Sequence, residues 1–205
     1  MYRFGITMRL TNAIDYNEPR ESIASDWNNY MLTAFPDSEF IYIPNIEENV
    51  INYISKLKIN VLILSGGDDL GITPRRDNSE LLALKYALKA KIPVIAICRG
   101  LQLVHAYFGG KFEPGNNGFV TRHKATNHLI EINGQAKEVN SYHTNYIIED
   151  SVSDSLEIFA RCKTDNSIEG IRNKDVLAMM WHPERDTKVV EWNKLLIESF
   201  LKNED

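Results

Sequence analysis

Two uninterrupted apolar segments constrain the fold more than any other feature of this chain. Residues 60–64 read NVLIL and residues 92–97 read IPVIAI. Runs of this length and β-branched content are typical of strands buried on both faces, as in parallel sheets covered by helices. A helical apolar pattern lies between them over Ser79–Ala90. The order of strand, helix and strand therefore predicts a right-handed crossover within an α/β fold.

The same alternation of strand-like and helix-like patterns extends along the rest of the chain. Further strands are predicted at Tyr2–Ile6, Phe40–Ile43, Leu129–Ile132, Ser155–Ala160 and Val176–Trp181. Further helices are predicted at Ser25–Phe35, Val50–Leu57, Leu101–Phe108 and Lys188–Lys202, the last with Val189, Trp192, Leu195, Leu196 and Phe200 facing the core. Lys111–Asn140 is rich in Gly, Asn and His and is predicted to form loops and hairpins. We expect one domain over residues 1–205 with a mostly parallel central sheet flanked by helices.

Composition excludes several classes of protein. The hydrophobic fraction is 43% and the charged fraction is 25%, which is typical of a soluble globular chain. No apolar run approaches the ~20 residues of a membrane span, and the N-terminal segment does not resemble a secretory signal. A net charge of −5 argues against a nucleic-acid surface, and two cysteines are too few for a disulfide framework. The expected setting is cytoplasmic, without a membrane or nucleic-acid partner.

Cys98 is the candidate nucleophile. It ends the IPVIAI segment and is followed by Arg99-Gly100 and a predicted helix. This strand, tight turn and helix form the pattern of a nucleophile elbow, with Cys in place of Ser. The N-terminus of the helix favours a thiolate there, and the Arg99 amide can donate to an oxyanion. The simpler alternative is that Cys98 is a small buried core residue.

Two other segments favour the catalytic interpretation of Cys98. Gly66 and Gly67 follow the NVLIL strand, where a turn without side chains lets a ligand approach the backbone closely. His182-Pro183-Glu184 follows the strand predicted at Val176–Trp181. Glu184 can bond one imidazole nitrogen of His182 while the other faces Cys98. This is the arrangement of a Cys–His–acid triad.

Together these segments resemble the class I glutamine amidotransferase superfamily. Its members carry a Gly-Gly turn, a Cys-x-Gly-x-Gln elbow and a late His-Pro-Glu, which here read 65–67 SGG, 98–102 CRGLQ and 182–184 HPE. The γ-glutamyl hydrolase branch is the most similar, on the segments 5–9 GITMR, 74–77 PRRD, 96–100 AICRG and 139–143 VNSYH. The resemblance covers nearly the whole chain and implies a flavodoxin-like three-layer sandwich. The chain departs from that branch at Thr144 and after Gly110, which affects the leaving-group side of the site more than the triad.

The resemblance implies a role for each matched residue. Cys98 would attack the γ-carbonyl of a γ-glutamyl group, with His182 as base and then acid and Glu184 orienting it. The oxyanion hole would comprise Gly66, Gly67 and the Arg99 amide. The substrate-binding residues would be Gln102, Asn140, Ser141, Tyr142 and Arg9. No cofactor is implied.

The leaving group is not fixed by these motifs. Basic residues expected near the cleft suit a phosphate group, and they are Arg9, Arg20, Arg75, Arg76, Arg122, His123 and Lys124. The short chain resembles small amidotransferase-like proteins of bacterial surface-polysaccharide pathways, which implies hydrolysis of γ-glutamyl-CDP-amidate to cytidine diphosphoramidate for capsule decoration. Hydrolysis of γ-glutamyl-γ-aminobutyrate is an alternative. A second alternative is a glutaminase subunit that delivers ammonia to a separate synthase, and a third is a non-catalytic binding protein on this fold.

Other candidate sites are weaker. His123, His128 and His143 have no compact ligand spacing and no cysteine pair beside them, so no metal site is predicted. Cys162 lies in a polar segment without a base nearby in sequence and is interpreted as a bystander. Asp68-Asp69 are interpreted as structural or solvent-facing. No Gly-Lys-Ser/Thr phosphate loop is present, so use of ATP is not expected.

Overall fold

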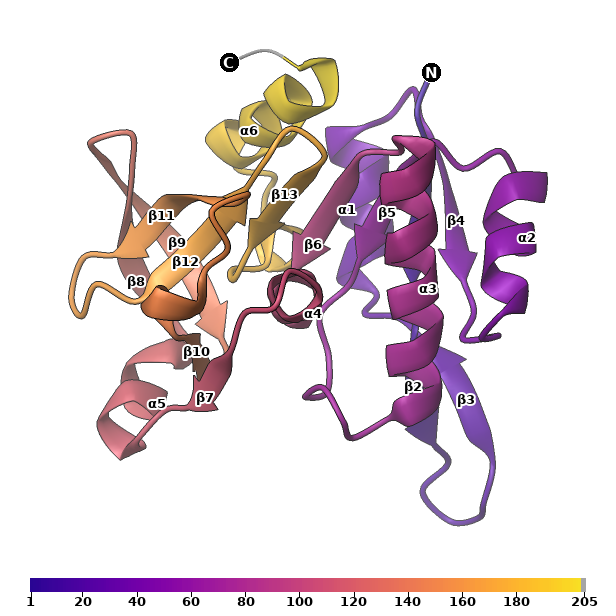
Figure 1. Ribbon diagram of the computed structural model, residues 1–205, viewed down its shortest axis with the longest axis horizontal. Coiled ribbons are helices and arrows are strands. Elements are labelled where there is room, and N and C mark those ends of the chain that lie inside the picture. The colour runs from indigo at the N-terminus through magenta and orange to yellow at the C-terminus, as the bar shows by residue number, and fades with distance from the viewer. Residues whose placement is uncertain (204–205) are drawn as a thin grey trace.

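A single nine-stranded sheet forms the centre of the computed structural model, which describes residues 1–203 (Figure 1). In spatial order its strands are β4 (Glu39–Ile43), β1 (Arg3–Thr7), β5 (Val61–Leu64), β6 (Val94–Ile97), β13 (Val176–Met179), β12 (Ile168–Arg172), β11 (Glu157–Cys162), β8 (Lys124–Ile132) and β9 (Gln135–Tyr142). Pairing is parallel from β4 to β13 and antiparallel from β13 to β9. The predicted α/β class with a parallel core is confirmed, and the antiparallel strands extend that core on one side.

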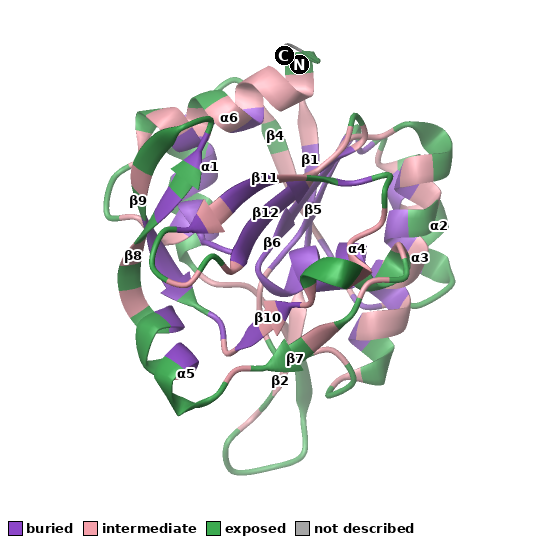
Figure 2. Cartoon of the chain, turned by 60° about the vertical axis from the view of Figure 1, so that its left-hand side comes forward, coloured by how far each residue is buried: buried purple, intermediate pink, exposed green. Residues whose placement is uncertain are grey.

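Helices cover both faces of the parallel strands and complete the three predicted layers. They are α1 (Asp26–Ala34), α2 (Asn49–Lys56), α3 (Pro74–Ala90), α4 (Arg99–Tyr107) and α6 (Glu191–Lys202). Figure 2 shows α1 and α6 on one side of the sheet and α2, α3 and α4 on the other. Every residue of β5, β6 and β13 is buried between these layers. Continuous apolar sequence in those strands is the direct result of burial on both faces.

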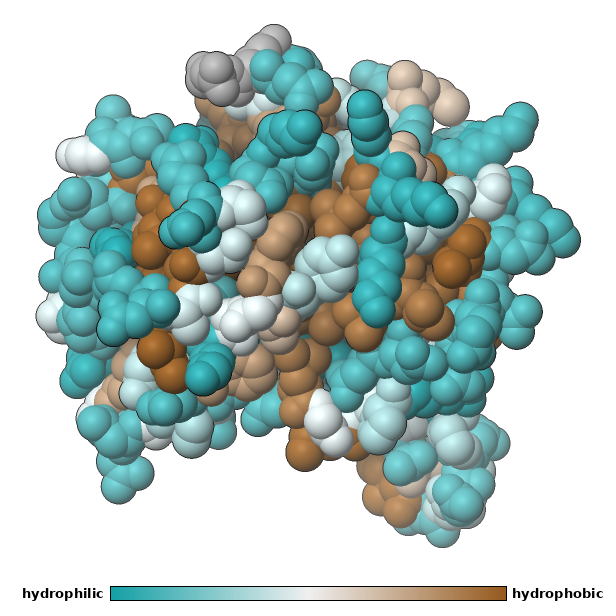
Figure 3. All heavy atoms as spheres, in the orientation of Figure 1, coloured by the Kyte–Doolittle hydropathy of each residue, from teal (hydrophilic) through white to brown (hydrophobic). Residues whose placement is uncertain are grey.

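Smaller elements gather where the parallel strands end, in the lower half of Figure 1. They are the hairpin of β2 (Arg9–Asn12) and β3 (Pro19–Ser22), the pair β7 (Phe112–Pro114) and β10 (Asn145–Ile147), the helix α5 (Asn117–His123), and the single turns η1 (Glu149–Ser151) and η2 (Pro183–Arg185). Seen from the same direction, hydrophobic residues show through the middle of the molecule, and the residues around them are mostly hydrophilic (Figure 3). Ligands bind at the carboxyl ends of strands in sheets of this kind.

Three expectations about the elements need correction. Leu195 is 50% exposed, because the inner side of α6 is formed by Asn193 and Ile197. The helix before β6 begins at Pro74, five residues before the predicted start, since proline is favoured at the first helical position. The region 111–140 holds a helix and a long hairpin as well as loops, with Asn116 capping α5 by accepting a bond from the Phe119 amide.

Within residues 1–203, no helix is both long enough and apolar enough to cross a membrane.

Candidate active site

Two neighbouring parallel strands bring the candidate nucleophile and the candidate base together. β6 ends at Ile97, which lies opposite Met179 at the end of β13. The Cys98 amide donates to the Met179 carbonyl at 2.8 Å, so the pairing continues one residue past β6. His182 follows Met179 by three residues, and both side chains therefore emerge at the same edge of the sheet.

The backbone at Cys98 forms a strained elbow. Its φ is 51° and its ψ is −102°, in the left-handed half of conformational space where non-glycine residues are rare. Such strain is characteristic of functional sites. Gly100 makes the elbow possible, because a Cβ on this residue would collide with the carbonyl oxygen of Leu64. The helix α4 starts directly after Cys98, so the side chain lies at the positive end of the helix dipole.

His182 is held by a carboxylate on its far side. Its Nδ1 donates to Glu184 Oε1 at 2.7 Å, and both side chains are buried. Burial by itself would lower the pKa of His182, but Glu184 and Cys98 outweigh that effect and raise the pKa to about 9. Because Nδ1 is bonded to Glu184, Nε2 is the ring nitrogen left to face Cys98. The geometry is suited to a thiolate–imidazolium pair.

The Gly-Gly turn after β5 packs directly on the imidazole. A Cβ on Gly66 would lie 2.5 Å from His182 Cε1, so only glycine fits beside the ring. Gly67 has a φ of 145°, and a Cβ there would overlap the guanidinium of Arg76. The turn therefore presents backbone, and no side chain, to the space around Cys98.

A network of buried ion pairs holds the Gly66-Gly67 turn in place. Arg76 donates to the carbonyl oxygens of Ser65 and Gly66 at 3.0 and 2.9 Å and pairs with Glu80 at 3.0 Å. Glu80 also pairs with Arg99 and accepts a bond from the Thr7 hydroxyl at 2.7 Å. Burial lowers the pKa of Arg76, which Glu80 partly offsets. The network fixes the turn and the first residue of α4 to one another.

The backbone amide and the side chain of Arg99 lie in different surroundings. Its amide lies in the first turn of α4, where helical N–H groups have no partner within the helix. That is the position expected of an oxyanion donor. Its side chain is buried and pairs with Glu80 and Asp77 from α3. Sequence reasoning identified the amide and missed the role of the guanidinium, although 74–77 PRRD was part of the resemblance.

The predicted substrate-binding residues of β9 lie beside the triad in different ways. Asn140 accepts from the His182 amide at 2.9 Å and donates to the His182 carbonyl at 2.8 Å. The hydroxyl of the fully buried Ser141 donates to the His123 carbonyl at 2.6 Å. Tyr142 is 41% exposed, and its ring meets the His182 ring edge to face at 5.6 Å. Asn140 and Ser141 therefore direct their polar side-chain atoms into the protein, while Tyr142 forms part of the rim.

Gln102 and Arg9 each carry a buried polar atom that bonds to no described protein atom. These atoms are Gln102 Oε1 and Arg9 Nε. Gln102 lies one helical turn after Cys98, whose carbonyl accepts from its amide. A small cavity of about 10 Å³ is lined in part by Arg9, Gly66, Glu184 and Arg185. Arg185 also stacks on the Tyr142 ring at 4.4 Å, a position that the sequence analysis did not single out.

Most other basic residues expected near the cleft are engaged elsewhere. Arg20 pairs with Glu18 in the β2–β3 hairpin, and Arg75 donates to the Asn45 carbonyl. Arg122 pairs with Asp165. His123 is fully buried, and Lys124 is exposed. Of that set, only Arg9 and Arg76 lie against the Gly-Gly turn, and Arg76 lies beneath it.

A second polar cluster lies in the antiparallel half of the sheet. It contains His123, His143 and Glu169, and Cys162 lies close to His123 and His128. Cys162 is buried, and its sulfur lies within 4.8 Å of a ring nitrogen of His123 and of His128. No base is near Cys162 in the sequence, but two imidazoles are near it in the folded chain. Linear spacing could not reveal this cluster, because its members come from four different segments.

Comparison with known proteins agrees with this geometry. The family model described as glutamine amidotransferase class-I matches residues 21–202. A γ-glutamyl-CDP-amidate hydrolase of Campylobacter jejuni is 31% identical over 95% of this chain and 98% of its own length. A putative glutamine amidotransferase-like protein of Lactococcus lactis is also 31% identical, over 75% of this chain and 77% of its own.

Solved structures with low sequence identity share the fold. A putative GMP synthase protein of Thermoplasma acidophilum has a TM-score of 0.70 at 16% identity, covering 98% of this chain and 93% of its own. A glutamine amidotransferase of Thermotoga maritima has a TM-score of 0.66 at 12% identity, covering 98% of this chain and 85% of its own. The match of the family model over most of the chain shows that this protein belongs to the class-I glutamine amidotransferase family.

Proposed function

We propose that this protein is a cysteine-dependent hydrolase of γ-glutamyl amides. Cys98 gives its proton to His182 and attacks the γ-carbonyl carbon. The proton then passes to the leaving nitrogen as the carbon–nitrogen bond breaks, which leaves a γ-glutamyl thioester. Water, deprotonated by His182, hydrolyses the thioester, releases L-glutamate and restores the thiol. The observation that carries this proposal is the His182–Glu184 bond of 2.7 Å on one side of the imidazole, with Cys98 on the other.

Backbone and side-chain groups around the thiol complete the site. The amides of the Gly66-Gly67 turn and of Arg99 stabilise the oxyanion of each tetrahedral intermediate, and loss of one such donor typically costs about 10²–10³ in rate. Gln102 Oε1, buried and without a protein partner, accepts from the α-ammonium group of the glutamyl moiety. Tyr142 borders the site, and the side chain of Asn140 positions His182.

For the substrate, we propose γ-glutamyl-CDP-amidate, hydrolysed in the cytoplasm to L-glutamate and cytidine diphosphoramidate for decoration of capsular polysaccharide. Support comes from the Campylobacter relative of that name, which is matched over nearly the full length of both chains. Arg9 and Arg185, which lie beside Gly66 and Glu184, supply positive charge suited to a pyrophosphate. A free small-molecule substrate requires no partner protein.

A substrate panel tests the proposal. The purified chain is incubated with γ-glutamyl-CDP-amidate, γ-glutamyl-γ-aminobutyrate, a γ-glutamyl anilide and L-glutamine, and glutamate release is followed by NMR with Cys98→Ala as the blank. We expect rapid release from the nucleotide amide and slow release from glutamine. Fast cleavage of γ-glutamyl-γ-aminobutyrate alone would replace the substrate and keep the mechanism.

Charge-removing variants separate substrate recognition from catalysis. Arg9→Gln and Arg185→Gln are expected to raise KM for the nucleotide amide about tenfold and to leave the anilide unaffected, since loss of a charged hydrogen bond costs roughly 1.5–3 kcal/mol. Arg20→Gln is the matched control, because Arg20 is exposed and paired with Glu18 in the β2–β3 hairpin. Equal effects on both substrates would contradict the assignment of these cations to the leaving group.

A glutaminase that works with a synthase is the second candidate, since a putative GMP synthase protein shares this fold. It predicts that only glutamine is cleaved, slowly, and that activity rises when a synthase partner is added.

A further inference from the structure

Three histidines and one glutamate meet away from the proposed catalytic centre. His123 ends α5, His128 lies on β8, His143 follows β9 and Glu169 lies on β12. We call these four residues the histidine cluster. The side chains of His123, His143 and Glu169 are at most 1% exposed, and that of His128 is 7% exposed. A group this polar needs a strong reason to be buried.

The spacing of the facing atoms matches a tetrahedral metal site. Glu169 Oε1 lies 3.4 Å from His123 Nδ1, 3.4 Å from His143 Nε2 and 3.6 Å from His128 Nε2. His123 Nδ1 and His143 Nε2 are 3.2 Å apart. Zinc–nitrogen and zinc–oxygen bonds of about 2.0–2.1 Å place tetrahedral ligand atoms roughly 3.3–3.4 Å from one another. One ion between Glu169 Oε1, His123 Nδ1 and His143 Nε2 would thus contact these three atoms at normal bond lengths, and His128 Nε2, 3.6 Å from the same oxygen, is placed to supply a fourth ligand.

The outer nitrogens of two rings are already bonded as in metal-binding histidines. His123 Nε2 faces Asp165 Oδ2 at 2.9 Å, and His143 Nδ1 faces the Asn145 carbonyl at 2.9 Å. Both partners are acceptors, so these ring nitrogens carry the protons. In the neutral rings the inner nitrogens therefore present lone pairs to one another and to Glu169. Carboxylate and carbonyl partners of this kind orient the histidine ligands of known metal sites.

The remaining histidine supplies an independent observation. Both ring nitrogens of His128 are buried without a hydrogen-bond partner among the described residues, and its Nε2 points toward Glu169. The Glu169 carboxylate is 1% exposed and lies 3.4–3.6 Å from a nitrogen of each of the three histidines. The cluster thus combines a buried negative charge with inward-facing imidazole nitrogens.

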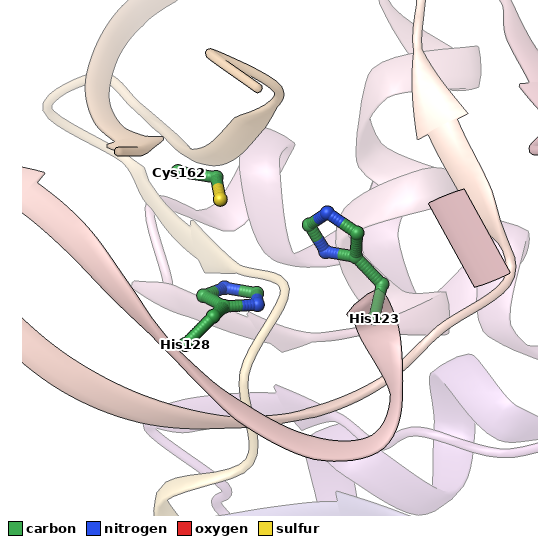
Figure 4. A group of neighbouring side chains, drawn as sticks. All are labelled: His123, His128 and Cys162. Carbon is green, nitrogen blue, oxygen red and sulfur yellow. The ribbon is translucent and has the colours of Figure 1, made fainter. Parts of the chain in front are cut away.

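We propose that the histidine cluster binds one divalent transition-metal ion, of which Zn²⁺ is the best match, through His123 Nδ1, His128 Nε2, His143 Nε2 and Glu169 Oε1. Four protein ligands in a closed pocket are typical of a structural site. Figure 4 shows the Cys162 sulfur directed toward the rings of His123 and His128. The ligand atoms of His123, His143 and Glu169 lie within 3.4 Å of one another, whereas those of His123, His128 and Cys162 are placed only within 4.8 Å, so we assign Cys162 as a neighbour and not a ligand.

An ion at this position would join α5, β8, β12 and the end of β9. His143 directly follows Tyr142, whose ring lies against His182. The Ser141 hydroxyl and the His143 amide both bond to the His123 carbonyl. The metal would therefore hold in place the wall of the proposed catalytic centre without touching the substrate.

Metal content tests this proposal directly. The chain is purified without a histidine tag from medium containing zinc, passed through gel filtration and analysed by inductively coupled plasma mass spectrometry. We expect about one zinc per chain, a lower melting temperature after chelation, and recovery when Zn²⁺ is returned. Substitution with Co²⁺ is expected to give the intense visible bands of a tetrahedral site without a sulfur-to-cobalt charge-transfer band.

Matched variants test the ligand set. Glu169→Gln and His143→Asn are expected to lower zinc affinity at least about tenfold. Cys162→Ser is expected to keep the metal, as is His105→Asn, because His105 is a buried histidine that bonds the Lys111 carbonyl outside the cluster. If a ligand variant does not fold, the metal content of the parent and the effect of chelation on its melting temperature test the proposal without that variant. The proposal is overturned if the parent contains no metal and its melting temperature changes with neither chelator nor Zn²⁺. It is also overturned if Cys162→Ser loses the metal while Glu169→Gln retains it.

Discussion

The Asn140→Asp variant tests whether this residue positions His182 or binds substrate. The amide nitrogen of Asn140 donates to the His182 carbonyl at 2.8 Å and to Asp186 Oδ1 at 2.9 Å. Its oxygen accepts from the His182 amide at 2.9 Å. The substitution keeps the shape of the side chain and replaces the donor with an oxygen. Both donated bonds are lost, and a carboxylate is placed against the Asp186 carboxylate.

The stability cost follows from these contacts. Two bonds at ~1 kcal/mol each, with two buried acceptors left unpaired, give about 2–4 kcal/mol. For a chain of this length that is a fall in melting temperature of roughly 4–16 °C. Burial already raises the pKa of Asp186, and the Asn140 bond lowers it, so the variant raises it further. The deficit is therefore expected to shrink at acidic pH, where one carboxyl is protonated, and to grow as the pH rises.

Steady-state kinetics distinguish the two roles. A displaced catalytic group can cost about 10²-fold in rate, so we expect kcat to fall roughly 10–100-fold while KM changes little. Lost substrate binding would instead raise KM with kcat unchanged. Asn127→Asp is the control, because Asn127 lies opposite Asn140 in the β8–β9 register and is exposed. A parent-like melting temperature, or an effect on KM alone, would refute the positioning role.

Four further predictions concern the same site. The charged form of His182, with a pKa of about 9, should keep Cys98 reactive toward iodoacetamide well below neutral pH. Glu184→Gln should lower the pKa of His182, which alkylation rates measured across pH will show. An unchanged pH profile would exclude Glu184 from the proposed mechanism. The stability contributed by charged His182 should be complete below the ordinary histidine pKa and lost as pH rises through 9, which melting curves of the parent and His182→Gln will compare. Glu80→Gln should destabilise the fold by about 3–5 kcal/mol in denaturant titration, since it leaves two buried arginines without their shared counter-charge. Gly100→Ala should destabilise it by about 1–3 kcal/mol, because the added methyl group overpacks against the end of β5. A denaturation midpoint equal to that of the parent would contradict the account of that variant.

The strongly patterned elements of the fold could be predicted from the sequence. Val61–Leu64 and Val94–Ile97 are buried on both faces, so their residues are apolar without interruption and their strands are easily recognised. β12, over Ile168–Arg172, contains Glu169 and Gly170 and has no apolar run, and it was missed. Its glutamate is buried among histidines from distant segments, and no local pattern records such a partner.

The candidate site was predictable to the extent that its parts are contiguous. Cys98 and the His182–Glu184 pair stand in short motifs, and their structure is consistent with the predicted triad. The partners of Asn140 are long-range contacts that only the folded chain brings together. The same holds for the support of the Gly-Gly turn by Arg76. Long-range hydrogen bonds set these roles, and they leave no periodicity in the sequence.

The neighbouring strands β6 and β13 lie where the parallel part of the sheet meets its antiparallel part. The proposed nucleophile and the proposed base follow adjacent strands whose register is fixed by backbone bonds, including the Cys98 amide to the Met179 carbonyl at 2.8 Å. The antiparallel strands beyond β13 supply the wall that carries Tyr142 and His143. Mutations can therefore reshape that wall, and with it the choice of leaving group, while the spacing between sulfur and imidazole is preserved. In a sheet built in this way, the strands that would set specificity are separate from the strands that hold the proposed nucleophile and base.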